Sequence, residues 1–247
     1  MLEIERAVCG CDYGSTSWTT RHEAERVGQL LGLNPGMRFL DVGAGSGWPG
    51  LYLARITGCD VTLVDVPMEG LRIAARRAAA EPLPGECWLI VADGAALPLK
   101  SAAFDAIGHS DLLCCLEAKA SVLKECRRVI RAGGRIAFTV ISIAPALSAE
   151  DYRRAVEAGP LFKETEVGYP AMLEQTGWQV THHLDLTVEY AAAARHMLRE
   201  EEARAQPLAR LLGEAEFSAR LARRRRTVQA LERGLLRREL IAADAIN

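Results

Sequence analysis

A glycine-rich run near residue 40 constrains this chain more than any other feature. The apolar stretch 39–42 contains one acid, Asp41, and Gly43, Gly45 and Gly47 follow directly. This pattern predicts a strand, a tight turn and a helix start, because glycine tolerates φ > 0 and lets the main chain approach a ligand closely. We therefore expect a nucleotide-like ligand at the end of this strand.

Strand and helix patterns alternate along the first 145 residues. A capping-box pattern at Thr20–Glu23 and a glycine at position 32 mark one helix before the first strand. Alternation of this kind predicts a parallel sheet with right-handed crossovers, in which ligands bind at the carboxyl ends of the strands. The expected strands are 38–42, 60–64, 87–91, 103–108 and 135–141, and the expected helices are 20–31, 47–56, 67–80 and 119–131.

The second half of the chain is less regular. Helices are expected over 149–158 and 170–176, a strand over 178–188, two helices between 191 and 233 that separate near Gln206–Pro207, and a last strand over 235–243. The predicted fold is α/β: Rossmann-like and doubly wound, with a mainly parallel seven-stranded sheet and a helical insertion before the last strand. We expect one domain, 1–247, made of an N-terminal lid and helix (1–34), a cofactor-binding core (35–145) and a substrate-capping half (146–247) with the insertion at about 190–233.

Composition narrows the class of protein. A chain of 247 residues, 49% of them hydrophobic, can bury a full core, and a net charge of −2 gives no general attraction to nucleic acid or to an anionic membrane. No apolar run reaches the ~18 residues of a membrane span, and the first six residues do not resemble a signal peptide. The seven cysteines form no C-x-x-C pair, so we expect reduced thiols, no metal and a cytoplasmic location; a labile site that uses Cys9 and Cys11 is the alternative.

The glycines can be assigned to two registers. Gly45, Gly47 and Gly50 spell G-x-G-x-x-G, the dinucleotide fingerprint, and an acid stands about 20 residues further on, as that fingerprint requires. Asp41 favours the register that begins at Gly43. A carboxylate there would repel an anionic pyrophosphate, but it suits the cationic amino group and sulfonium of S-adenosylmethionine (AdoMet). Gly50 then serves helix packing.

A second acid–glycine pair supports the AdoMet interpretation. Asp93–Gly94 follows the apolar run 88–92. From about residue 35 to 141, under half of its length, the chain resembles class I AdoMet-dependent methyltransferases of the small-molecule "type 11" group. The matching motifs stand in the order of that family, at 40–47, 61–65, 91–99, 104–107 and 123–134.

The resemblance implies how the methionine half of AdoMet would be held. Gly43, Gly45 and Gly47 would line it with main chain, and Asp41 would lie near its amino group through a water molecule.

The adenosine half would meet the next two strand ends. By the same resemblance, Asp65 would accept hydrogen bonds from both ribose hydroxyls, with Val66 beside it. Asp93 would contact the adenine amino group, while Gly94 and Ala95 leave room for the ring. The alternative for both acids is a helix N-cap or a turn.

Aromatic residues before the first strand are candidates for a lid. Tyr13 could donate its hydroxyl to the cofactor carboxylate, and Trp18 could shield the sulfonium by a cation–π contact. The alternative is a solvated arm anchored by two aromatic rings. Trp48, directly after the third glycine, packs either over the ligands or in the core.

His109 is the candidate general base. His109-Ser110-Asp111 follows the fourth predicted strand, where the family places its acceptor-facing loop. Asp111 would orient His109 or contact the substrate, and His109 is also a candidate for positioning the cofactor without proton transfer. A base is needed only when the acceptor must lose a proton.

The arginine run 223–226 is interpreted as part of a solvated helix. Four consecutive helical residues point in four directions, so they cannot form one phosphate-binding face, although one of them could reach an anionic substrate. We therefore expect an AdoMet-dependent methyltransferase that acts on a small molecule, at N, O or C. The alternatives are an RNA or protein methyltransferase and a non-catalytic AdoMet-binding protein; the oligomeric state is open, with a dimer as one option.

Overall fold

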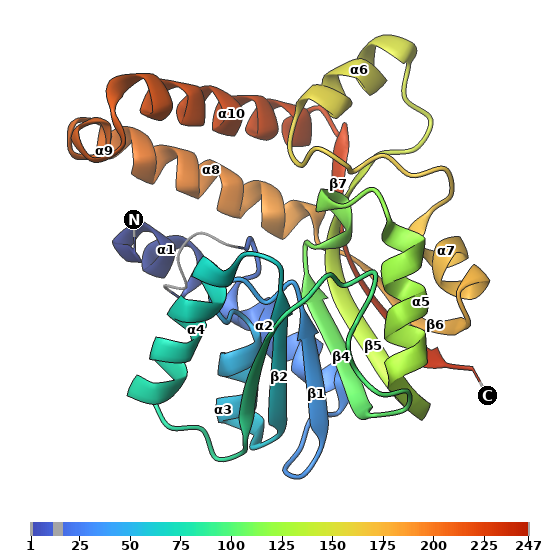
Figure 1. The fold of residues 1–247 in the computed structure, drawn as a ribbon. Helices are drawn as coiled ribbons and strands as arrows, with labels where there is room; N and C mark the ends of the chain where they lie inside the picture. The colour runs from blue at the N-terminus through green and yellow to red at the C-terminus, as the bar shows by residue number, and fades with distance from the viewer. Residues whose placement is uncertain (1, 12–16, 247) are drawn as a thin grey trace.

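A seven-stranded sheet organises the molecule (Figure 1). The computed structural model describes residues 2–11 and 17–246. Its strands follow the order β3-β2-β1-β4-β5-β7-β6, and β7 runs antiparallel to both of its neighbours while the others pair in parallel. The strands are β1 (Arg38–Val42), β2 (Asp60–Asp65), β3 (Cys87–Val91), β4 (Phe104–Ser110), β5 (Ile130–Ile143), β6 (Trp178–Asp185) and β7 (Leu236–Ala245).

The strand order confirms the predicted fold class. The strand order changes direction between β1 and β4. The carboxyl ends of these two strands therefore flank the crevice where ligands bind in open α/β sheets. The expected mainly parallel, seven-stranded, doubly wound sheet is present, with helices inserted before the last strand.

Helices cover both faces of the sheet (Figure 1). Helices α2 (Arg21–Leu31), α3 (Gly50–Thr57) and α4 (Met68–Ala80) pack on one face, and α5 (Lys119–Val129) and α7 (Tyr169–Gln175) pack on the other. The remaining helices are α1 (Leu2–Cys9), the 3₁₀ turn η1 (Leu113–Cys115), α6 (Ala149–Glu157), α8 (Thr187–Ala203), α9 (Ala205–Leu212) and α10 (Glu214–Glu232).

The helix before the first strand has the predicted termini. The Thr20 hydroxyl accepts a hydrogen bond from the Glu23 amide, and the Glu23 carboxylate accepts one from the Thr20 amide at 2.7 Å. This is a complete capping box. Gly32 ends the helix in the left-handed conformation at φ 65°, as expected of a C-cap glycine.

The helical insertion differs from the prediction. Three helices, not two, connect β6 to β7, and Pro207 lies inside the first turn of α9 instead of marking a break. Proline is tolerated there because the first amides of a helix have no acceptor within it. The breaks fall at Arg204 and at Gly213, whose φ of 88° favours glycine.

The insertion lies over the carboxyl ends of the parallel strands (Figure 1). Helices α8 and α10 pack side by side there, and α1 packs against α8. No helix within residues 2–11 and 17–246 is long and apolar enough to cross a bilayer.

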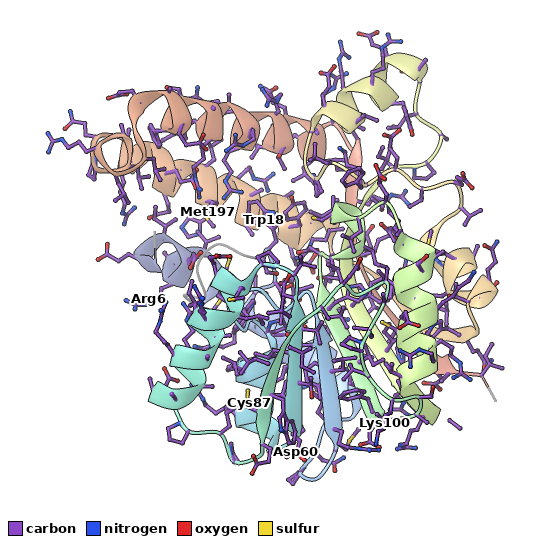
Figure 2. All side chains as sticks on the ribbon, in the orientation of Figure 1. Arg6, Trp18, Asp60, Cys87, Lys100 and Met197 are labelled. Atoms are coloured by element: carbon purple, nitrogen blue, oxygen red, sulfur yellow. The ribbon has the colours of Figure 1, made fainter. Side chains whose placement is uncertain are left out.

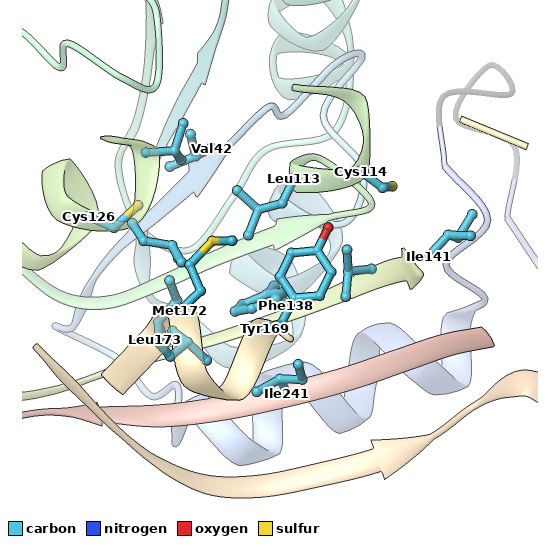
Figure 3. Packing of buried hydrophobic residues seen from close by; sticks show 14 of the residues in the cluster. Val42, Leu113, Cys114, Cys126, Phe138, Ile141, Tyr169, Met172, Leu173 and Ile241 are labelled. Carbon is cyan, nitrogen blue, oxygen red and sulfur yellow. The ribbon is translucent and has the colours of Figure 1, made fainter. Parts of the chain in front are cut away.

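The largest core lies on the α5 and α7 side of the sheet (Figure 3). Phe138 of β5, Tyr169 and Met172 of α7 and Cys126 of α5 meet there, all of them buried. A second cluster fills the opposite face beneath α2, α3 and α4. A third joins Ile4 of α1 to the insertion and so fixes the N-terminal helix onto it.

Candidate functional site

The turn after β1 is shaped by glycine. The Gly43 and Ala44 amides both donate to the Val64 carbonyl, at 2.8 and 3.1 Å. Gly43 has a φ of 74°, and a Cβ at this residue would lie 2.7 Å from Cδ1 of Leu112. Only glycine therefore fits between the turn and Leu112.

Asp41 lies beneath this turn. Its side chain is 1% exposed, and Oδ2 accepts a hydrogen bond of 3.0 Å from the Gly50 amide at the start of α3. Burial raises the pKa of Asp41 to about 8, although the Gly50 amide opposes the rise. A Cβ on Gly50 would lie 2.5 Å from that same oxygen, which agrees with the prediction that Gly50 serves packing.

The two other predicted acids stand at the ends of β2 and β3. The Asp65 carboxylate accepts hydrogen bonds from the Gly45 amide at 2.6 Å and from the Val66 amide at 2.7 Å. Asp93 accepts from the Ala95 amide at 2.8 Å. Both acids therefore organise turns, and each carboxylate oxygen keeps a second lone pair for a ligand.

A cavity of about 180 Å³ opens at these strand ends. We call it the strand-end cavity. It brings together five of the predicted cofactor residues: Gly43, Asp65, Val66, Asp93 and Gly94. Its remaining lining residues are Val42, Val64, Pro67, Ala92, Leu112 and Leu116.

The lining suits an adenosine-type ligand. Gly94 packs tightly against Val42, because a Cβ there would lie 3.0 Å from Cγ1 of Val42. The apolar walls sit beside two carboxylates that can accept from hydroxyl and amino groups. Asp41, Gly45, Gly47 and Ala95 lie beside or beneath the cavity without lining it. Tyr13 lies outside the described residues.

A second cavity, of about 190 Å³, lies under the insertion; we call it the cap cavity. Trp18 and Trp48 line it together with Asp111, and Figure 2 places Trp18 below α8 beside Met197. The Trp48 indole donates to the Thr19 carbonyl at 2.7 Å, which fixes the ring against the segment before α2. The other lining residues are Glu5, Cys9, Cys11, Ser17, Cys115, Ile141, Pro160, Met197 and Arg224.

The segment 111–116 forms a wall between the two cavities. Asp111 and Cys115 face the cap cavity, whereas Leu112 and Leu116 face the strand-end cavity. Both cavities therefore depend on the position of this one turn, which contains η1.

The structure does not bring His109 and Asp111 together. His109 lies within β4, not after it; its ring is 2% exposed, stacks on Phe138 with centroids 4.3 Å apart, and has no hydrogen-bond partner within the described part of the chain. Burial lowers the pKa of His109 to about 3. The expected orienting role of Asp111 is wrong, because Asp111 is bound to Arg238, and His109 lines neither cavity.

Arg238 of β7 is the residue that sequence reasoning missed. It is fully buried and donates to both oxygens of Asp111 at 3.1 Å, to Glu23 at 2.8 Å and to the Thr19 hydroxyl at 3.0 Å. Burial alone would lower the pKa of Arg238, but the two carboxylates raise it above its ordinary value. A signal existed: Arg238 stands two residues from both Leu236 and Leu240, on the inward positions of a strand.

The arginine run is only partly solvent-exposed. Arg223 and Arg225 pair with the exposed acids Glu216 and Glu202, as expected of a solvated helix. Arg224 instead turns inward, with its guanidinium carbon 4.5 Å above the centre of the Trp18 ring.

The remaining polar groups do not form a metal site. No cluster of three or more His, Cys, Asp or Glu residues that could hold a metal occurs in residues 2–11 and 17–246. Cys9, Cys11 and Cys115 all line the cap cavity, and no cysteine of the described chain is in a disulfide. Burial, together with the charge of Glu5, raises the pKa of Cys9 to about 11, so this thiol is protonated at neutral pH.

Comparison with known proteins identifies the core. Residues 40–138, which contain the strand-end cavity, match a family model described as a methyltransferase domain. This part of the chain is a methyltransferase domain. The expected resemblance to AdoMet-dependent methyltransferases is thereby confirmed.

Similarity to a curated relative covers more of the chain than the methyltransferase domain does. Methyltransferase GfsG of Streptomyces halstedii is 30% identical over 169 residues, which are 66% of this chain and 60% of that protein. The chain thus spans less than two thirds of the length of this curated relative.

Solved structures share the fold of nearly the whole chain, not of the methyltransferase domain alone. Phosphoethanolamine N-methyltransferase 2 of Haemonchus contortus, in complex with AdoMet, has a TM-score of 0.82 at 15% identity, covering 100% of this chain and 57% of that one. The cyclase SpnF has a TM-score of 0.75 at 21% identity, covering 91% and 80%. At these identities the likeness concerns the fold, and the activity has to be argued from the site.

Proposed function

We propose that the chain is an AdoMet-dependent methyltransferase that acts on a small molecule. One observation carries the proposal: the strand-end cavity, inside the methyltransferase domain, unites Gly43, Asp65, Asp93 and Gly94. When bound, AdoMet supplies a methyl group already activated on a sulfonium. The protein's own task is then to hold donor and acceptor in line, and positioning supplies much of the rate.

The residues around the strand-end cavity divide this task. Asp65 accepts from the ribose hydroxyls with the lone pairs that the Gly45 and Val66 amides leave free. Asp93, with Gly94 and Ala95, accepts from the adenine edge and leaves room for the ring. Gly43, Gly45 and Gly47 present main chain to the methionine half. Asp41 supports the glycine turn from below through the Gly50 amide.

The acceptor belongs in the cap cavity. This cavity shares the 111–116 wall with the strand-end cavity and combines aromatic, apolar and carboxylate groups under the insertion. Asp111 is the carboxylate that this wall presents to the cap cavity, and Arg238 fixes its orientation. His109 is not part of this proposal, since its ring is buried against Phe138. Methyl transfer to N, O or C is compatible with the lining.

A cytoplasmic location is also proposed, because the seven cysteines form no disulfide. Nucleic acid is not proposed as a substrate, given the net charge of −2.

Calorimetric titration with AdoMet tests the donor assignment. We expect saturable AdoMet binding and none of NADH. Asp65→Asn should weaken AdoMet binding by about tenfold or more, the effect of losing charge-assisted hydrogen bonds. Asp60→Asn, at the opposite end of β2, is the matched control and should leave the affinity unchanged. NADH binding without AdoMet binding would overturn the proposal.

Transfer of a labelled methyl group tests the activity itself. Labelled AdoMet and a cell extract, separated afterwards into small molecules, RNA and protein, should give label in the small-molecule fraction. Binding without any transfer would instead favour a non-catalytic AdoMet-binding protein.

A further inference from the structure

One face of α10 gathers basic side chains over the proposed acceptor cavity. Arg220, Arg223, Arg224 and Thr227 are spaced i, i+3, i+4 and i+7, so they share one helical face. Together with Arg226 they line a groove of about 420 Å³. We call it the arginine groove. The run 223–226 alone does not make this face; Arg220, one turn earlier, completes it.

The groove holds more positive charge than its own carboxylates balance. Arg220 and Arg224 share one acid, Glu201, at 2.7 and 3.5 Å. Glu201 is fully buried beneath them, so a single carboxylate serves two guanidinium groups. The Arg224 atom in this ion pair is Nε, which is buried and, among residues 2–11 and 17–246, has this long contact to Glu201 and no hydrogen bond.

The rim adds further cationic groups. Within the described chain Arg223 pairs with the exposed Glu216 alone, at 3.1 Å, a contact of small energy in water. Arg226 has no ion pair within the described residues, and Glu157 is the one acid among the groove's described lining residues. Four guanidinium groups thus converge on a cavity with one lining carboxylate and one beneath it.

The arginine groove continues into the cap cavity. Trp18, Pro160 and Arg224 line both spaces, and Arg224 lies over the Trp18 ring. A ligand anchored among the arginines would therefore extend past Trp18 toward the wall that borders the strand-end cavity.

We propose that the arginine groove binds a phosphate or diphosphate group carried by the methyl acceptor. Planar guanidinium forks match tetrahedral phosphate oxygens, and several of them spread over more than one helical turn suit a multiply charged group better than one carboxylate. The apolar and aromatic lining of the cap cavity then receives the body of the acceptor. This inference rests on the proposed function, because it identifies the class of the acceptor.

Binding of simple amphiphiles tests the inference directly. Octyl phosphate, octanoate and 1-octanol would be titrated into the full chain by calorimetry, with inorganic pyrophosphate as the headgroup alone. We expect octyl phosphate to bind at least about tenfold more tightly than octanoate, with 1-octanol weaker than both, since only the phosphate engages several guanidinium groups. Equal affinity for octyl phosphate and octanoate would overturn the proposal, as would no binding of octyl phosphate.

Variants of α10 locate the site. Arg224→Ala and the rim variant Arg223→Ala/Arg226→Ala should each raise the Kd of octyl phosphate about tenfold or more. Arg225→Ala removes the same charge from the other side of the run, where Arg225 pairs with Glu202 at 2.7 Å, and should leave that Kd within about twofold. The rim variant breaks no buried pair, so it remains informative if Arg224→Ala is unstable. An equal loss in Arg225→Ala would overturn the site.

AdoMet titration of the same proteins separates the two proposals. We expect every arginine variant to bind AdoMet as the unmodified chain does. If the unmodified chain binds octyl phosphate through Arg224 but not AdoMet, the donor assignment fails and the anion site stands. If it binds AdoMet but the arginine variants leave the Kd of octyl phosphate unchanged, the donor assignment stands and the anion site fails.

Discussion

Asp41 shows how a single buried carboxyl can hold a ligand-binding turn. Its hydrogen bond to the Gly50 amide ties the end of β1 to the start of α3, and burial raises its pKa to about 8. The side chain is therefore mostly protonated at neutral pH, in contrast to an exposed aspartate.

The stability contributed by Asp41 should depend on pH. The folded-state pKa lies above the unfolded one, so the contribution is complete below about pH 4 and is lost as pH rises toward 8. Asp41→Asn removes the titration while keeping an oxygen for the Gly50 amide. Urea unfolding would be measured at pH 5, 6.5 and 8. The free energy of unfolding of the variant should rise relative to that of the unmodified chain by an amount on the order of 1 kcal/mol per pH unit. A constant difference across this range would contradict the assignment.

Sequence reasoning could place the residues that lie at strand ends. Gly43 follows β1, Asp65 ends β2, and Asp93 and Gly94 come just beyond β3; a parallel sheet places these strand ends on one rim. The same reasoning failed for His109. The strand was predicted to end at residue 108 but ends at 110, so His109 lies inside the strand and its ring is in the core, not in a loop.

At the scale of elements, terminal signals decided how well helices could be predicted. Thr20, Glu23 and Gly32 fixed both ends of α2, since caps act through bonds within a few residues. Pro207 misled because proline both breaks helix interiors and favours first turns, and only the surrounding structure distinguishes the two cases.

The capping box offers a direct measurement of element stability. Thr20→Ala deletes the acceptor of the Glu23 amide and should lower the free energy of unfolding by about 1 kcal/mol. Thr20→Ser keeps the hydroxyl and should lose much less. Urea unfolding of the three proteins measures the difference; an equal loss for serine and alanine would show that the hydroxyl is not the stabilising group.

At the scale of the whole molecule, Arg238 joins parts that are far apart in sequence. It connects the segment before α2, the turn after β4 and the last strand, and its guanidinium carbon lies 5.5 Å from the centre of the Tyr190 ring on α8. Its partners lie up to 219 residues away, so no local pattern could reveal them.

Removal of this arginine should be costly. Arg238→Met leaves Asp111 and Glu23 buried without a counter-charge, and breaking such a group typically costs about 3–5 kcal/mol. Arg237→Met changes the exposed neighbour and should cost little. Adding Asp111→Asn to Arg238→Met should recover part of the loss in urea unfolding, because one stranded charge is gone. No recovery would indicate that lost packing, not charge, dominates.

The wall at 111–116 has a consequence for how ligands in the two cavities affect each other. Asp111 and Cys115 face one cavity and their neighbours Leu112 and Leu116 face the other, so we expect a ligand that displaces one pair to move the other. If the strand-end cavity holds the donor and the cap cavity the acceptor, as proposed, their occupancies are then thermodynamically coupled. Because such coupling is reciprocal, the factor by which one ligand changes the affinity of the other is the same in both directions.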